Sequence, residues 1–308
     1  MNWNSKSVLV IGGFGFIGQN LVRKLIDLGA TISILDDFSS KQFEKKSDVF
    51  KVIRASTCDE NLVNLVKDDI DIIFHFGAPS SVILFNENPS ARFNNTVGGF
   101  LNVLSLARDK KVEKLVYPSS GSVYGSTPPP QSEDIVPRPV NLYAIAKLAC
   151  EQIARFYSDI NSVGLRIFAG YGPGEEHKGD IASPITLFLK SILENKQPIV
   201  YGDGNQTRDF VYISDVVDAI IKSAERETPP VINVGIGKSY SFNVAIKLIN
   251  DILGKEIQPQ YIDKPTKYLE NTLADTSLLK NVLDITPLTL EEGLERYVET
   301  SNLKRFSH

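Results

Sequence analysis

Three side chains of this sequence are suited to moving a proton to and from a hydroxyl group: Tyr143, Lys147 and Ser120. Tyr143 and Lys147 stand four positions apart at the start of a predicted helix over residues 142–157, so both project from one face. A lysine ammonium close to a phenol stabilises the phenolate and lowers the phenol pKa from about 10. The tyrosine can then exchange a proton with a substrate hydroxyl while a hydride leaves the same carbon. Ser120, just after a predicted strand over residues 114–118, can donate a hydrogen bond to the reacting oxygen.

A second group of residues is suited to binding a dinucleotide. Gly12, Gly15 and Gly18 form a G-x-x-G-x-x-G pattern between a predicted strand and a predicted helix. Such glycines let the backbone turn tightly and approach a pyrophosphate, which the helix N–H groups and the helix dipole then face. Asp36 ends the next strand, near the separation of about 20 residues expected of a ribose-binding acid. Because a carboxylate accepts hydrogen bonds from both ribose hydroxyls and repels a 2′-phosphate, these features predict NAD rather than NADP.

The residues of these two groups can meet only in a fold that brings the ends of several strands together. The pattern of apolar residues predicts such a fold. Strands and helices alternate as far as residue 168, with strands predicted over residues 7–11, 31–35, 49–54, 70–76, 114–118 and 164–168, and helices over 17–28, 93–110 and 142–157. Near-continuous apolar strands separated by helices imply an α/β fold with a doubly wound parallel sheet of the Rossmann type. Beyond residue 168 Gly and Pro become frequent, which predicts a smaller α/β C-terminal substrate lobe. The expected division is an NAD-binding domain over residues 1–169, with a return segment at about 211–236 that includes a strand at 231–234, and a substrate lobe over residues 170–210 and 237–308.

The segment around Ser120 resembles a known enzyme family. Residues 118–125 read P-S-S-G-S-V-Y-G, and with Tyr143, Lys147 and the glycine spacing they resemble the extended short-chain dehydrogenase/reductases. Within these, the chain is similar to the NAD-dependent epimerase/dehydratase family, which includes the UDP-hexose 4-epimerases. The F-H-F-G-A run at residues 74–78 also fits, so the resemblance covers nearly the whole chain. It implies that Ser120, Tyr143 and Lys147 are the catalytic residues and that Lys147 also holds the nicotinamide ribose.

The resemblance further implies that NAD is the cofactor. The cofactor-binding residues expected from it and from the glycine pattern are Gly12, Gly15, Phe16, Ile17, Gly18, Asp36, Ser56, Thr57, Phe76, Gly77, Ala78, Asn95, Tyr143 and Lys147. Ser56 stands where relatives carry an Asp near the adenine. A serine can still donate a hydrogen bond there.

A nucleotide-sugar substrate is implied by the second lobe. Residues 201–212 read Y-G-D-G-N-Q-T-R-D-F-V-Y and closely resemble the family segment whose arginine holds the nucleotide diphosphate, which assigns Arg208 to the phosphates. Ser122 and Ala169 complete the expected substrate-binding residues. Ala169 stands where the family often has Asn, so one polar contact to the nucleotide sugar is missing. Residues 263–267 replace a second phosphate-binding arginine with lysines, which act as point charges.

The expected reaction is epimerisation at C4 of a UDP-glucose/galactose or UDP-N-acetylhexosamine type of sugar, through a transient 4-keto intermediate. A 4-ketoreductase uses the same Ser/Tyr/Lys set and stays open as an alternative. Dehydratases of the superfamily usually carry an acidic pair where this chain has Gly121 and Ser122, which disfavours 4,6-dehydration. A non-enzymatic dinucleotide sensor would typically lack the tyrosine or the lysine, and this chain has both. His75 is expected to pack beside the cofactor, and the charged residues 175–180 either reach the sugar or form a solvated loop.

Composition narrows the choice of partners. The chain has 308 residues, a formal net charge of −4 and no basic run, so neither nucleic acid nor a membrane surface is an expected partner. Its cysteines and histidines form no cluster typical of a metal site, so no metal is expected. A polar start and the lack of an apolar stretch of about 18 residues predict a cytoplasmic protein. Because helices equivalent to residues 93–110 and 142–157 pair subunits into a four-helix bundle in relatives, a homodimer is expected by analogy.

Overall fold

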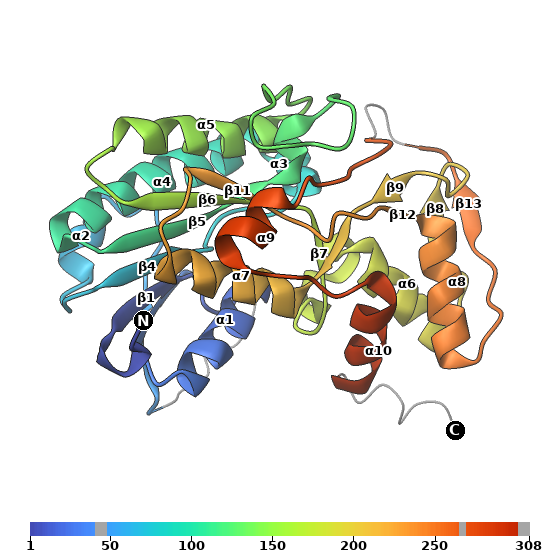
Figure 1. Cartoon of the computed structure of the whole chain (residues 1–308), viewed down its shortest axis with the longest axis horizontal. Helices are drawn as coiled ribbons and strands as arrows, with labels where there is room; N and C mark the ends of the chain where they lie inside the picture. The colour runs from blue at the N-terminus through green and yellow to red at the C-terminus, as the bar shows by residue number, and fades with distance from the viewer. Residues whose placement is uncertain (41–47, 265–268, 301–308) are drawn as a thin grey trace.

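A seven-stranded sheet forms the core of the larger part of the molecule, at the left of Figure 1. The computed structural model describes residues 1–40, 48–264 and 269–300. All neighbouring strands of this sheet run parallel, and their spatial order is β11 (Val231–Val234), β6 (Ser162–Ile167), β5 (Lys114–Ser120), β4 (Ile72–His75), β1 (Ser7–Ile11), β2 (Thr31–Asp36) and β3 (Phe50–Arg54). The order reverses between β1 and β4, where doubly wound sheets bind ligands at the carboxyl ends of their strands.

Helices cover both faces of the sheet, because alternate residues of a strand point to opposite sides. Val8 and Val10 lie in an apolar core shared with α1 (Phe16–Asp27) and α7 (Ile213–Glu225). Leu9 and Ile11 lie in a second core on the other face, shared with α4 (Pro89–Lys110) and α5 (Leu142–Phe156). Figure 1 shows α4 and α5 side by side along one face of the sheet. Three shorter helices complete the layers: α2 (Leu62–Leu65) and α3 (Val82–Glu87) against α4, and α9 (Ser277–Leu283) against α7 and β11.

A smaller lobe lies at the right of Figure 1, beyond the carboxyl ends of the large sheet's strands. It contains three two-stranded sheets. These pair β7 (Ala169–Tyr171) with β10 (Phe210–Tyr212), β8 (Ile199–Tyr201) with β13 (Gln260–Ile262), and β9 (Thr207–Arg208) with β12 (Tyr240–Ser241). The lobe's helices are α6 (Pro184–Leu193), α8 (Phe242–Leu253) and α10 (Leu290–Thr300). Short 3-10 helices occur at η1 (Trp3–Ser5), η2 (Gly121–Tyr124) and η3 (Glu176–Ile181).

The predicted fold class is confirmed: a parallel Rossmann-type sheet with smaller C-terminal sheets. The predicted helix over 93–110 begins earlier, at Pro89, because the Asn88 side chain accepts a hydrogen bond from Ala91 N and proline suits the first helical turn. The division of the chain into domains stays a prediction.

The described residues contain neither a membrane-spanning helix nor a cluster of metal ligands. None of their helices has the length and apolar character needed to cross a membrane. Their His, Cys, Asp and Glu side chains form no group of three that could hold a metal ion.

Candidate active site

The glycine-rich turn between β1 and α1 leaves no room for a side chain at Gly12 or Gly18. Gly12 has φ of 78°, and a Cβ there would lie 2.4 Å from Gly77 N. A Cβ on Gly18 would lie 2.0 Å from the carbonyl oxygen of Gly12. α1 begins at Phe16 after Gly15, which has no side chain to cap it, so the N–H groups of the first turn are available to an anion. The turn therefore forms a cradle suited to a pyrophosphate.

Asp36 is held rigidly at the end of β2. Its side chain is buried and accepts one hydrogen bond on each oxygen, from Phe14 N at 3.0 Å and from Phe38 N at 2.8 Å. Burial raises the pKa of Asp36, and the two backbone N–H groups counteract that rise. The oriented carboxylate keeps lone pairs for the hydroxyls of a ribose.

Ser56, Thr57 and Asn95 come together between the end of β3 and α4. The Ser56 hydroxyl accepts a hydrogen bond from Cys58 N at 3.2 Å, and Cys58 Sγ lies 3.2 Å from Asn95 Oδ1. Asn102 donates to the carbonyl of the buried Thr57 at 2.9 Å. These three expected cofactor residues thus lie on one side of the strand ends.

Phe76, Gly77 and Ala78 follow β4 directly. Phe76 N donates to Ile11 O at 2.7 Å, which fixes the end of β4 against the glycine-rich turn. The tight turn, the buried acid and the adjoining strand ends together fit an NAD molecule lying across the switch point.

The three proton-moving residues meet beside this cradle. Ser120 is the last residue of β5, and its hydroxyl lies close enough to the Tyr143 phenol of α5 to lower the phenol pKa. Lys147, on the same face of α5, places its Nζ 5.8 Å from the centre of the Tyr143 ring. All three side chains are buried. Ser122, at 3.1 Å from Ser120 Oγ, is the other hydroxyl in the cluster.

Burial dominates the pKa values of this cluster. It lowers the pKa of Lys147 to about 8 and raises the pKa of Tyr143, while the hydrogen bond with Ser120 lowers the Tyr143 pKa. The sequence predicted that the lysine would lower the tyrosine pKa. That prediction is wrong in direction, because desolvation of the phenolate is the larger effect.

His75 is fully buried at the end of β4 and stacks on Phe100, with 6.0 Å between ring centres. Burial and the charge on Lys147 lower its pKa to about 3, so the imidazole is neutral at neutral pH. This is the environment expected of a packed residue beside the cofactor rather than of an acid or a base.

Arg208 is fixed at the edge of the lobe. Its guanidinium donates to Leu269 O at 2.7 Å and to Glu270 O at 3.1 Å, and it lies 5.5 Å from the centre of the Phe242 ring. Lys264 forms an ion pair with Glu270 at 2.7 Å, whereas Lys267 lies outside the described residues.

A cavity of about 670 Å³ is lined in part by the backbone partners of Arg208 and in part by the segment that follows η2. Its lining comprises residues 125–129, Val140 and residues 269–271. Leu269 and Glu270 are the carbonyl partners of Arg208, and the other lining residues adjoin η2 and the start of α5.

Ala169 begins β7, and its backbone N–H donates to Asp209 O at 3.0 Å. Its side chain is a methyl group and so offers a substrate no polar atom.

The charged loop at residues 175–180 is partly packed and partly solvated, with Glu176, Gly179 and Asp180 exposed. Glu175 is buried and accepts hydrogen bonds from Ser183, Thr186 and Lys178. Lys178 Nζ also lies 4.4 Å from the centre of the Phe16 ring at the start of α1. The loop is therefore packed against the helix that carries the glycine-rich turn.

Sequence reasoning missed a buried ion pair behind Ser120, between Glu151 and Arg166. A signal was present, because Glu151 follows Lys147 by four positions and so shares the face of α5 that carries Tyr143. The partner on β6 cannot be read from that spacing.

Comparisons of sequence and of structure with known proteins all match one enzyme family, and the relatives align with nearly the whole chain. Residues 8–235 match the model of the NAD dependent epimerase/dehydratase family. A putative UDP-glucose 4-epimerase of Methanocaldococcus jannaschii is 31% identical over 94% of this chain and 97% of its own length. The solved UDP-N-acetylglucosamine 4-epimerase of Methanobrevibacter ruminantium M1 is 31% identical, with a TM-score of 0.90 over 97% of this chain and 99% of that one. The solved UDP-glucose 4-epimerase of Thermotoga maritima is 28% identical, with a TM-score of 0.92 over the same shares of the two chains.

Proposed function

The chain belongs to the NAD-dependent epimerase/dehydratase family, and on that basis we propose that it inverts the configuration at C4 of a nucleoside-diphosphate sugar. The observation that carries the proposal is the buried contact of Ser120 with Tyr143, with Lys147 on the same helix face, beside the dinucleotide cradle. The named relatives include 4-epimerases of UDP-glucose and of UDP-N-acetylglucosamine, which makes these sugars the first substrates to test.

NAD is the cofactor, and when bound it accepts a hydride from the sugar carbon and returns it. The glycine-rich turn holds the pyrophosphate, Asp36 the adenosine ribose, and Lys147 the nicotinamide ribose. The rigid carboxylate of Asp36, fixed by two backbone donors, disfavours a 2′-phosphate through charge repulsion.

Tyr143 is the acid–base group of the proposed reaction. As phenolate it takes the proton of the sugar 4-hydroxyl while the C4–H bond breaks, and Ser120 donates a hydrogen bond to the ketone oxygen that results. After the keto sugar turns its other face towards the cofactor, Tyr143 returns the proton to that oxygen. Burial makes the phenolate costly and therefore a strong base, so the Lys147 ammonium must compensate for its charge.

Arg208 holds the substrate at its other end. Because three backbone carbonyls already orient its guanidinium, binding a diphosphate requires little further ordering of the side chain. The adjoining cavity, of about 670 Å³, has the size of a small-molecule site. In this proposal Ser122 lies beside the sugar, and Ala169 offers the sugar no polar atom.

The direct test incubates the purified protein separately with UDP-glucose and UDP-N-acetylglucosamine and analyses the products by NMR. We expect conversion to the 4-epimer, with NAD released when the protein is denatured. Failure to form either 4-epimer, together with no bound NAD, would refute the proposal. A stoichiometric change in cofactor absorbance would instead indicate a 4-ketoreductase.

A further inference from the structure

Behind the proposed catalytic cluster lies an ion pair withdrawn from solvent. Arg166 on β6 donates through Nε and Nη2 to the two oxygens of Glu151 on α5, at 2.9 Å and 2.7 Å. The exposed fractions of the two side chains are 2% and 0%. Burial lowers the pKa of Arg166, but the hydrogen bonds and charge of Glu151 more than offset this and raise it, so the guanidinium is charged.

Stability alone is a weak reason for such a pair. Removing two charges from water costs several kcal/mol per ion, and apolar residues of similar volume often stabilise a protein as well or better. The hydrogen bonds that the pair makes with neighbouring residues indicate what it contributes besides stability.

The pair holds the chain on both sides of Ser120. On one side, the hydroxyl of Ser119 donates a short hydrogen bond to Glu151 Oε1. On the other, Arg166 Nη1 donates to the hydroxyl of Tyr124 at 2.9 Å. Tyr124 is the last residue of η2, the short helix that Ser120 caps. Ser119, directly before Ser120, and Tyr124, four residues after it, are thus both tied to one buried charge pair.

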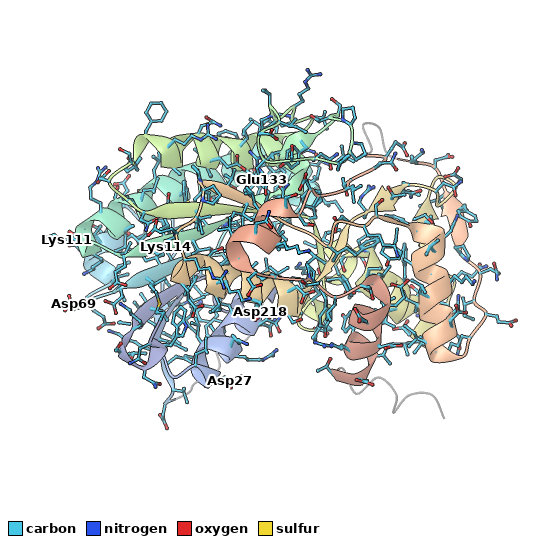
Figure 2. The ribbon with its side chains drawn as sticks, viewed as in Figure 1. Asp27, Asp69, Lys111, Lys114, Glu133 and Asp218 are labelled. Atoms are coloured by element: carbon cyan, nitrogen blue, oxygen red, sulfur yellow. The ribbon has the colours of Figure 1, made fainter. Side chains whose placement is uncertain are left out.

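The network continues to the last strand of the sheet. Tyr124 donates to Asn233 Oδ1 at 2.7 Å, and Asn233 N donates to Glu133 Oε1 at 2.7 Å. Figure 2 places Glu133 close to β11 and α9, well away from Lys111 and Lys114 at the amino ends of the strands. The carboxyl ends of β5, β6 and β11 are therefore fixed relative to one another and to α5.

We propose that Glu151 and Arg166 are positioning residues, which hold Ser120 against Tyr143 by fixing Ser119 and Tyr124. Glu151 lies on the same face of α5 as Tyr143 and Lys147. One helix therefore carries both the acid–base group and the carboxylate that fixes the position of Ser120. A misplacement of about 1 Å in a reacting group can cost about 100-fold in rate. The inference rests on the proposed function for the reaction that Ser120 serves.

Ser119→Ala tests the link without removing the pair. Arg208, Asp36 and the glycine-rich turn are untouched, so we expect kcat to fall about tenfold, with KM and NAD content unchanged. Ser119→Thr restores a hydroxyl and should recover most of kcat. The matched control is Ser223→Ala, because Ser223 is also buried but its hydroxyl has no hydrogen-bond partner in the part of the chain that the structure describes. It should leave kcat at the wild-type value.

A double variant, Glu151→Leu with Arg166→Met, replaces both charges with apolar side chains. It should remain folded by circular dichroism and retain NAD, yet lose at least as much kcat as Ser119→Ala. If this double variant does not fold, the kcat of Ser119→Ala alone tests the positioning role. Wild-type kcat in Ser119→Ala would overturn the inference while leaving the proposed function intact.

A crystal structure of Ser119→Ala with NAD separates the two proposals further. We expect the Ser120 side chain to be displaced from Tyr143 in this variant and in place in Ser223→Ala. If the wild type epimerises neither sugar, the proposed function fails, and this structural comparison still decides the positioning role. An unmoved Ser120 would then overturn it.

Discussion

At the scale of single residues, Tyr143 and Lys147 share an environment that opposes both of their charges. Burial raises the pKa of the phenol and lowers that of the ammonium to about 8. A phenolate and an ammonium side by side form a pair without net charge, which is less costly to bury than either ion alone. The proposed acid–base role of Tyr143 therefore depends on Lys147 rather than on solvent.

Tyr143→Phe isolates that role. The ring and its packing against Phe85 remain, but the proton acceptor is lost. We expect NAD content close to wild type and a loss of turnover of about 10²–10⁴-fold, the usual contribution of a general base. NAD released on denaturation and kcat are the two measurements. Unchanged kcat would remove Tyr143 from the mechanism.

His75 gives a prediction for stability against pH. Its pKa is about 3 in the folded chain and 6.5 in its ordinary state. Below pH 6.5 the unfolded chain gains a proton that the folded chain refuses until about pH 3, so the stability present above pH 6.5 is lost as the pH falls. The slope from this residue approaches about 1.4 kcal/mol per pH unit.

Urea denaturation at pH 7, 6 and 5 measures this slope. His75→Phe keeps an aromatic ring against Phe100 but cannot titrate, so its free energy of unfolding should fall less steeply with acid than that of wild type. A constant offset between the two proteins does not affect the comparison. Parallel pH profiles would show that His75 does not titrate as described.

At the scale of elements, the sequence predicts the strands of the large sheet well because buried parallel strands are continuous apolar runs. It also locates the glycine-rich turn, Asp36 and the Tyr143–Lys147 pair, whose spacings are local. It does not predict α3, a six-residue helix too short to show a period. Nor does it predict the packed loop at residues 175–180 or the Glu151–Arg166 pair, because tertiary contacts between distant segments create both.

The turn between β1 and α1 should be intolerant of any side chain at its third glycine. In Gly18→Ala the new methyl group would lie 2.0 Å from the Gly12 carbonyl, and both atoms are backbone-fixed. We expect the protein to lose bound NAD and to unfold at lower temperature. Gly98→Ala in α4 is the control, since its Cβ would have no atom of the described chain within 4 Å. If Gly18→Ala retained NAD, the proposed role of this turn in binding the pyrophosphate would be wrong.

At the scale of the whole molecule, α4 and α5 present apolar side chains to solvent. Phe156 is 87% exposed, Leu142 46%, Ile145 41% and Leu101 37%. The three residues of α5 recur at helical spacing, as expected of a face that packs against another helix. We propose that this face joins two copies of the chain.

Charges introduced into that face should separate the copies. We expect Ile145→Asp with Phe156→Asp to give a monomer where wild type is a dimer, as measured by light scattering across a range of concentrations. Val244→Asp, at an exposed apolar position of α8 in the lobe, should remain a dimer. A dimer that survives both charges would place the interface elsewhere.

The dinucleotide cradle, the proton-moving cluster and the cavity lined by Leu269 and Glu270 lie where the lobe meets the large sheet. In the proposed reaction they act together, so that the hydrogen of C4 leaves and returns without passing through water. A UDP-hexose carrying deuterium at C4 tests this most directly, with products analysed by NMR and mass spectrometry in ordinary water. We predict a 4-epimer that keeps its deuterium at C4, with no net reduction of NAD. A 4-epimer that has lost its deuterium to solvent would rule out transfer of the C4 hydrogen through NAD.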